Sequence, residues 1–115
     1  MRTGVFVYIS GPISPRNGKL VEENVAAALH VFLDVIQSGI PAFCPHLQAI
    51  YPSAHDIDYD LWMDYDYRVI DRCTHMLCME GWETSNGAAL EYQYARAQGI
   101  PVAFSIPELI LMLEK

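Results

Sequence analysis

The first half of the chain alternates a continuous apolar run with an amphipathic one. Residues 5–9 are apolar, β-branched or aromatic and stop at a Ser-Gly-Pro sequence, which is typical of a buried parallel strand followed by a loop. Over residues 20–36, apolar positions recur at steps of three and four before Gly39, which predicts a helix that ends there. Residues 40–44 predict a second strand, and Pro41 at its start favours a sheet edge. Together these elements form a βαβ unit.

The second half repeats this alternation after an irregular stretch. Residues 45–60 hold prolines, histidines and acids without a sustained period, so we expect a long loop of the kind that often lies over a site. Ser85 is a good N-cap, and Gly99 is a good stop for the helix that follows it. The elements predicted after the loop are a helix over 61–72, a central strand over 75–79, the helix from Ser85 to Gly99, a strand over 101–104 and an amphipathic helix carrying residues 109–113.

Strands separated by helices at this spacing predict one parallel sheet with right-handed crossovers. The expected fold class is α/β. We expect a single flavodoxin-like three-layer domain over residues 1–115, with a short parallel sheet of four to five strands and helices on both faces. The chain has 115 residues, of which 52% are hydrophobic, enough to fill one core but not two.

Charge and cysteine content exclude several classes of protein. Seven Lys and Arg against fourteen Asp and Glu give a net charge of −7, and the basic residues form no stripe, so a nucleic-acid polymer is not an expected partner. The apolar runs are too short to span a bilayer, and the N-terminus lacks the apolar region of a signal peptide, so we expect a cytoplasmic protein with no membrane partner. Cys44, Cys73 and Cys78 have no CxxC spacing and are expected to be reduced, buried thiols.

In an open parallel sheet, ligands bind at the carboxyl ends of the strands. The loop after the first strand contains Ser10, Gly11 and Pro12, and the loop after the third leads through Trp82 into Ser85 and Gly87. Free backbone N–H groups at that helix start suit an anionic or strongly polar ligand group, although Ser85 can equally be an ordinary cap. Trp82 can stack on a base or anchor its loop against the sheet.

Two carboxylates are what glycosyl-transfer chemistry usually requires. Glu91 lies about one and a half turns into the helix after Ser85 among small and apolar neighbours, where it either faces the ligand crevice with a raised pKa or faces water. A second carboxylate can come from the acidic segment before the third strand, which can also be a solvated helix face. Its members are Asp58, Asp60, Asp64, Asp66 and Asp71.

A metal site is not predicted, and no cofactor is expected. Cys44, His46, His55 and Asp56 fall in one loop region, but their spacing matches no defensible pattern of ligands.

Three segments carry a resemblance to a known superfamily. They are Tyr-Ile-Ser-Gly-Pro-Ile over residues 8–13, Trp62-Met63-x-x-Asp66, and Gly-Trp-Glu-x-Ser-x-Gly-Ala-x-x-Glu over residues 81–91, with Ala95 and the Gly-Ile-Pro of residues 99–101 following. In this order they resemble the nucleoside 2-deoxyribosyltransferase-like superfamily, which includes the 2′-deoxynucleoside 5′-phosphate N-hydrolases. The chain is most similar to its small, largely uncharacterised phage and bacterial members.

The resemblance implies a role for each matched residue. Glu91 would be the nucleophile that attacks C1′ of the deoxyribosyl group and forms a covalent glycosyl-enzyme. Asp66 would interact with the leaving base or the nucleophile, and Tyr8 would orient the nucleophile. The implied substrate-binding residues are Ser10, Gly11, Pro12, Arg16, Trp82, Ser85 and Gly87, with Ser85 and Gly87 holding the 5′ end of the sugar.

The first loop departs from the pattern of the phosphate-requiring hydrolases. These enzymes place a serine directly after the loop glycine and an arginine two positions beyond it, where this chain has Pro12 and Ser14. Arg16 is displaced by two residues and would have to reach a phosphate from there. The longer transferases often borrow side chains from a neighbouring subunit, so the resemblance also implies a homodimer or higher homo-oligomer.

The function expected from the resemblance is cleavage or exchange of the N-glycosidic bond of a 2′-deoxynucleoside or its 5′-monophosphate. An alternative is a non-catalytic module that binds a nucleotide or nucleotide-sugar on the same fold. The partner in either case is a small molecule.

Overall fold

The computed structural model of the chain describes residues 1–13, 21–50 and 52–114. Four short strands and four α-helices alternate along it, joined in places by 3-10 turns. The elements are β1 (Val7–Ser10), α1 (Val21–Gln37), β2 (Ala42–Phe43), η1 (Pro45–Ile50), η2 (Pro52–Asp56), α2 (Tyr59–Ile70), β3 (His75–Cys78), η3 (Trp82–Thr84), α3 (Asn86–Ala97), β4 (Val102–Ala103) and α4 (Ile106–Leu113).

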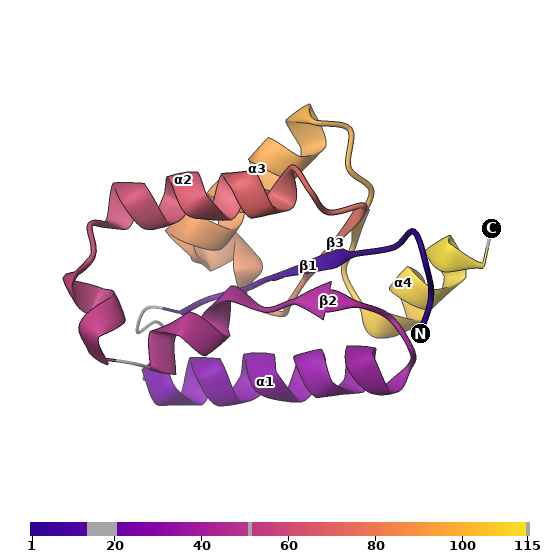
Figure 1. Cartoon of the computed structure of the whole chain (residues 1–115), viewed down its shortest axis with the longest axis horizontal. Helices are drawn as coiled ribbons and strands as arrows, with labels where there is room; N and C mark the ends of the chain where they lie inside the picture. Colours follow the sequence, from indigo (N-terminus) through magenta and orange to yellow (C-terminus); the bar gives the residue numbers. More distant parts are fainter. Residues whose placement is uncertain (14–20, 51, 115) are drawn as a thin grey trace.

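The strands form one parallel sheet in the order β2-β1-β3-β4. Four residue pairs join β1 to β3, whereas β2 and β4 each contribute two pairs at the edges. Helices α2 and α3 lie on one face of the sheet and α1 on the other (Figure 1). The α/β class, the parallel sheet, the central place of the third strand and the edge place of the second are confirmed, and the arrangement fits a flavodoxin-like domain.

Alternation along β1 supplies both layers of the core. Val7 and Ile9 pack with α1 and α4 in one apolar cluster, and Tyr8, between them, belongs to the cluster on the other face. Because successive side chains of a strand point to opposite faces, Tyr8 and Ser10 share the face covered by α2 and α3. Both side chains are fully buried. The strand thereby places two hydroxyl groups in the layer between the sheet and these two helices.

The start and stop predicted for α3 are confirmed. The Ser85 side chain accepts a hydrogen bond from the Ala88 N–H at 3.3 Å, as an N-cap does. At the other end Gly99 has a φ of 76°, the left-handed conformation that favours glycine just past a helix. Between these ends, the buried positions of α3 are Ala88, Glu91 and Ala95.

The described residues between 45 and 60 contain more secondary structure than the sequence predicts. Instead of a long irregular loop, the described part of the segment contains η1 and η2, and α2 begins at Tyr59 rather than at Leu61. Pro45 and Pro52 open the two 3-10 turns because proline already has the required φ and lacks the N–H that a first turn leaves unpaired. The Asp58 side chain accepts from the Asp60 N–H at 3.4 Å and so caps α2 earlier than the apolar periodicity indicates.

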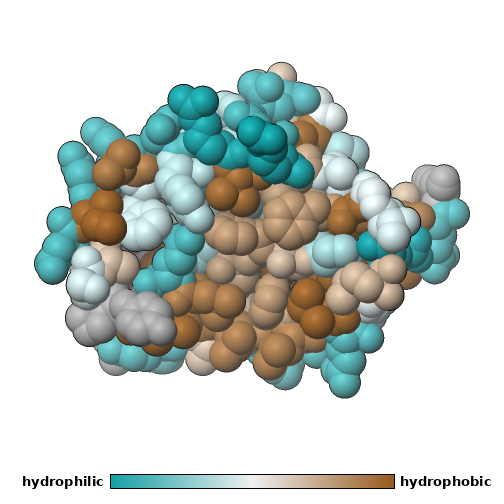
Figure 2. Space-filling model, in the orientation of Figure 1, coloured by the Kyte–Doolittle hydropathy of each residue, from teal (hydrophilic) through white to brown (hydrophobic). Residues whose placement is uncertain are grey.

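The edge of the sheet formed by β2 has an apolar surface. In Figure 2, hydrophobic side chains gather across the middle of the face on which β2 lies, and hydrophilic ones cover the helices above it. Ala42 and Phe43 of this strand are half-buried. No helix among the described residues has both the length and the apolar character needed to cross a membrane.

Leu109 is expected to anchor α4. It is fully buried in the cluster with Val7 and Ile9, whereas Leu111, two positions along the helix, is 62% exposed. Leu109→Ala should lower the free energy of unfolding by about 2–5 kcal/mol because it leaves a cavity. The matched control Leu111→Ala should change it by less than about 0.5 kcal/mol. Urea denaturation of both variants checks this, and equal effects would contradict the packing of α4.

Candidate active site

Glu91 is the centre of the candidate site. It lies on the face of α3 that covers the sheet, and only 5% of its surface is exposed. The Tyr8 hydroxyl donates to Oε2 at 3.0 Å, and the Ser10 hydroxyl donates to Oε1 at 2.8 Å. Each oxygen of a buried carboxylate therefore has a donor from β1, and the two bonds fix the plane of the group.

A second buried carboxyl group faces Glu91 from α2. Asp66 is 7% exposed, and its Oδ1 has no hydrogen-bond partner among the described residues. The group is close enough to Glu91 and Tyr8 for its charge and hydrogen bonding to act on both. An unpaired oxygen at this place is costly for the free protein, and a donor group of a ligand would satisfy it.

Burial and mutual repulsion favour a state in which the two carboxyl groups hold one proton between them. Burial raises the pKa of Glu91 well above its ordinary value of 4.5, and the charge and hydrogen bonding of Asp66 raise it further. Burial also raises the pKa of Asp66, which its bonds to Glu91 and Tyr8 partly offset. Burial raises the pKa of Tyr8 too, so its hydroxyl stays protonated and remains a donor. Two carboxylates this close in a low dielectric do not both ionise readily.

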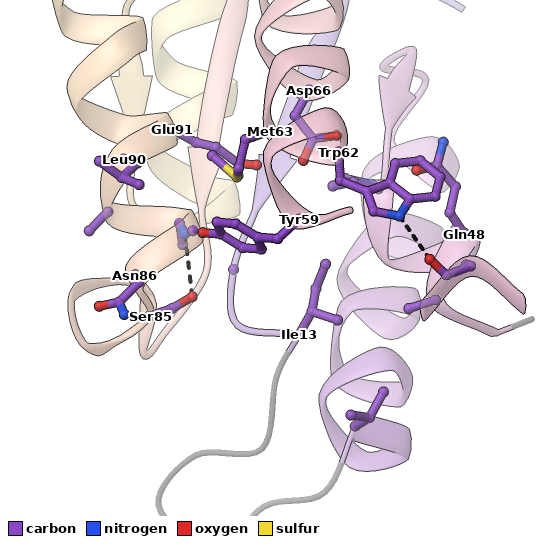
Figure 3. Close-up of a pocket in the computed structure, with 18 of the residues that line it drawn as sticks. Ile13, Gln48, Tyr59, Trp62, Met63, Asp66, Ser85, Asn86, Leu90 and Glu91 are labelled. Atoms are coloured by element: carbon purple, nitrogen blue, oxygen red, sulfur yellow. Dashed lines mark hydrogen bonds between the residues drawn. The ribbon is translucent and has the colours of Figure 1, made fainter. Parts of the chain in front are cut away.

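A cavity of about 890 Å³ opens over the two carboxyl groups. Figure 3 shows Glu91 and Ser85 on one side, Trp62 and Gln48 on the other, and Tyr59 between them. Asp66 and Glu91 are the only charged side chains among the described residues that line it. Its described lining consists of Gly11, Ile13, Val21, Pro45, Gln48, Ala49, Ala54, Ile57, Tyr59, Trp62, Met63, Asp66, residues 85–91 and Gln93.

The N-terminus of α3 forms one end of this cavity. Ser85, Asn86 and Gly87 all line it. A Cβ atom on Gly87 would lie 3.4 Å from the Tyr59 hydroxyl, so glycine keeps this end open beside the tyrosine ring. The first-turn N–H groups and the cap hydroxyl together provide a polar, weakly positive end opposite the apolar walls.

Five of the ten predicted site residues line the cavity, namely Glu91, Asp66, Gly11, Ser85 and Gly87. Tyr8 and Ser10 lie directly behind Glu91 and reach the cavity through its carboxylate.

The other three predicted site residues are not brought to the cavity. Trp82 packs against Tyr92 and Phe104, with ring centroids 4.5 and 5.7 Å away, so it anchors its loop within an aromatic cluster. Pro12 lines a second, smaller hollow on the other face of the sheet. Arg16 lies outside the described residues.

The structure adds side chains that sequence reasoning did not select as site residues. Tyr59, Met63 and Trp62 lie on the first turns of α2 and line the cavity. Met63, Trp62 and Tyr59 precede Asp66 by three, four and seven residues, a spacing that places all of them along one face of a helix and that the sequence already contained. His46, considered only as a metal ligand, is fully buried beside the first loop. Among the described residues, no three His, Cys, Asp or Glu side chains gather as a metal site.

A comparison with protein families matches residues 5–104 to a domain of unknown function, DUF4406. The chain belongs to this family. No curated protein matches it. The match covers β1 through β4 and therefore every residue of the DUF4406 site described above.

The geometry of this DUF4406 site supports chemistry with two carboxyl groups. Glu91, held through both oxygens, is oriented as a nucleophile or base would need to be, and Asp66 can give or take a proton next to it. The cavity provides apolar walls and a polar end at α3, which suit a ligand with a flat apolar part and a hydroxylated or anionic part.

Burial of Glu91 gives stability a definite pH dependence. Below about pH 4.5 the carboxyl is protonated in both the folded and the unfolded chain. As pH rises through the raised folded pKa, the unfolded chain releases the proton first, so the free energy of unfolding should fall. Glu91→Gln removes this dependence. The melting temperature of the wild type relative to Glu91→Gln should therefore decrease between pH 4.5 and 8. The control Glu80→Gln, at an exposed position, should run parallel to the wild type, and a parallel Glu91→Gln curve would contradict the burial.

Proposed function

We propose that this DUF4406 protein cleaves or exchanges the N-glycosidic bond of 2′-deoxynucleosides or their 5′-monophosphates through a covalent glycosyl-glutamate intermediate. The observation that carries the proposal is the Glu91 carboxylate, buried at the floor of a large cavity, bonded by Tyr8 and Ser10 and facing Asp66. The resemblance of the three matched segments supports the choice of substrate.

In the first step, Glu91 Oε attacks C1′ while the bond from C1′ to the base nitrogen breaks. The electron pair of that bond goes to the base, which takes a proton from Asp66. The reactive state thus has Glu91 ionised and Asp66 protonated. In the free protein, burial and Asp66 hold the pKa of Glu91 well above its ordinary value, so the proton has to move from Glu91 to Asp66 when substrate binds. The hydrogen bonds from Tyr8 and Ser10 lower the pKa of Glu91 and so assist this transfer.

In the second step, water or another free base attacks C1′ and releases Glu91. The attacking group gives its proton to Asp66, which restores the starting state, so both half-reactions balance with the residues present. Water as acceptor gives 2-deoxyribose or its 5-phosphate, and a base as acceptor gives an exchanged nucleoside. Apolar walls limit access of bulk water and strengthen the interactions of the paired carboxyl groups.

The 5′ end of the sugar is placed at the N-terminus of α3. Ser85 and Gly87 line this end of the cavity, and first-turn N–H groups bind a hydroxyl or a phosphate. We propose further that the protein acts in the cytoplasm as a homodimer or larger homo-oligomer, as the resemblance implies. Exposed apolar side chains at the start of α2 agree with a covered surface, since Tyr59 is 52% and Leu61 61% exposed.

Glu91→Gln should abolish turnover. The amide cannot attack C1′, and loss of a nucleophile lowers kcat by a factor on the order of 10⁴ or more. The measurement separates free base and exchanged nucleoside by chromatography after incubation with deoxynucleosides and their monophosphates, with and without a second base. Thermal melting checks that the variant is folded.

A wild type that releases no base across this panel, but melts at higher temperature with the same ligands, would favour the alternative of a nucleotide-binding module. Full activity of Glu91→Gln would refute the covalent mechanism.

Asp66→Asn should slow base release to a different extent for substrates with different leaving groups. An amide cannot supply a proton, so release of an unmodified base, which leaves as an anion unless it is protonated, should slow by about 10²–10⁴. A 7-methylated purine deoxynucleoside already carries a positive charge and leaves as a neutral base, so its release should fall much less. Equal losses for both substrates would contradict Asp66 as the proton donor.

A further inference from the structure

The buried polar side chains fall into two groups. Six are buried among the described residues, and four of them belong to the candidate site, namely Ser10, Asp66, Ser85 and Glu91. The other two, Asn24 and His46, are 5% and 0% exposed and do not line the cavity. Burying a polar group is costly unless it makes a hydrogen bond. Both bond to the first loop, at the consecutive carbonyl groups of Pro12 and Ile13.

The protonation of His46 follows from its partners. Its Nε2 lies 3.0 Å from the Pro12 carbonyl oxygen, which can only accept, so Nε2 carries the hydrogen. Burial lowers the pKa of His46 to about 4, so the ring is neutral near pH 7 and its Nδ1 is free to accept. The Cys44 sulfur lies 3.7 Å from Nδ1, and burial raises the pKa of that thiol, which therefore keeps its hydrogen.

The described part of the first loop, residues 11–13, is held from three sides. The Asn24 amide of α1 donates to the Ile13 carbonyl at 3.2 Å, and His46 of η1 donates to that of Pro12. On the β3 side, the Met79 N–H donates to the Ser10 carbonyl at 2.8 Å. A Cβ on Gly11 would lie 3.0 Å from the Met79 side chain, so the loop is pressed against the end of β3.

This arrangement joins two walls of the cavity. Gly11 and Ile13 form part of the wall from the first loop, and Pro45 and Gln48 of η1 form part of the facing wall. The hydrogen bond between His46 and the Pro12 carbonyl connects these two segments, and neither of its residues lines the cavity. Glu91, in contrast, is held from the strand itself, through Tyr8 and Ser10 of β1.

We propose that His46 and Asn24 are positioning residues that set the width of the cavity between the first loop and η1, and with it the affinity for substrate. Only the kinetic consequences of this proposal rest on the proposed function. Neither residue touches the reacting atoms. Because the nucleophile is oriented independently, loosening the wall weakens substrate and transition state alike, which raises KM and leaves kcat nearly unchanged.

The test compares two substitutions at one position. In His46→Gln, the side-chain amide can place an N–H donor near the position of Nε2, whereas the shorter Asn in His46→Asn cannot reach the Pro12 carbonyl. We expect KM to rise about tenfold in His46→Asn with kcat within about twofold, and His46→Gln to restore most of the affinity. Asn24→Leu, which removes the other donor at similar volume, should also raise KM. His30→Asn is the matched control, because His30 is exposed on α1 and should leave both constants unchanged.

Two readouts are independent of turnover. Nitrogen-15 NMR at pH 7 should show His46, assigned by its absence in His46→Gln, as a neutral ring with the hydrogen on Nε2. Amide hydrogen exchange of the peptide covering residues 11–13 should be faster in His46→Asn than in the wild type or His46→Gln.

These readouts separate failure of the two proposals. If the wild type has no activity, the proposed reaction fails, while NMR and exchange still decide on the loop. A hydrogen on Nδ1, or unchanged exchange and KM in a folded His46→Asn, would overturn the positioning role. A fall in kcat at unchanged KM would also overturn it, since the loop would then act on the chemical step.

Discussion

The structure depends on keeping a carboxyl group inside the layer between a sheet and its helices. Removing Glu91 from water is unfavourable, and the fold compensates with hydrogen bonds from Tyr8 and Ser10, the only two inward positions of β1 on that face. Asp66 adds a second buried carboxyl group and with it a requirement for a proton. The register between β1 and α3 is constrained accordingly, because a shift of one residue along the strand would turn both donors to the opposite face. Hydrogen bonding to Glu91 and burial of the apolar side chains of β1 therefore favour the same alignment.

The chain can maintain this arrangement because the rest of the layer is conventional. The cluster on the face of α1 and α4 consists of apolar side chains. It therefore stabilises the fold without adding buried polar groups that need hydrogen-bond partners. On the site face, aromatic and sulfur-containing side chains surround the polar group, including Met76, Cys78 and the ring of Phe43, whose centroid is 5.8 Å from that of Tyr8. Such surroundings lower the local dielectric, which makes the hydrogen bonds to Glu91 stronger and its ionisation harder.

Much of the fold could be predicted because its elements have strong local causes. The steps of three and four in α1, the Ser85 cap and Gly99 all act within a few residues, and each was placed correctly. The segment over residues 45–60 was mispredicted because 3-10 turns have no apolar period, and Pro45 and Pro52 each start such a turn. In the site, Glu91 and Asp66 could be named from spacing and resemblance, but their contact depends on how α2 and α3 pack. Trp82 illustrates the limit, since its partner Phe104 lies 22 positions away and no local pattern distinguishes an anchor from a ligand contact.

The narrowness of the sheet has a consequence for how the molecule fluctuates. Four residue pairs hold β1 to β3, while only two hold each outer strand, so the backbone ladder is weakest at its margins. Partial opening is therefore expected to begin at β2 or β4 and to reach the central pair of strands last. The two donors of Glu91 lie on the central strand β1, so loss of either outer strand would leave the hydrogen bonds that orient this carboxyl group in place.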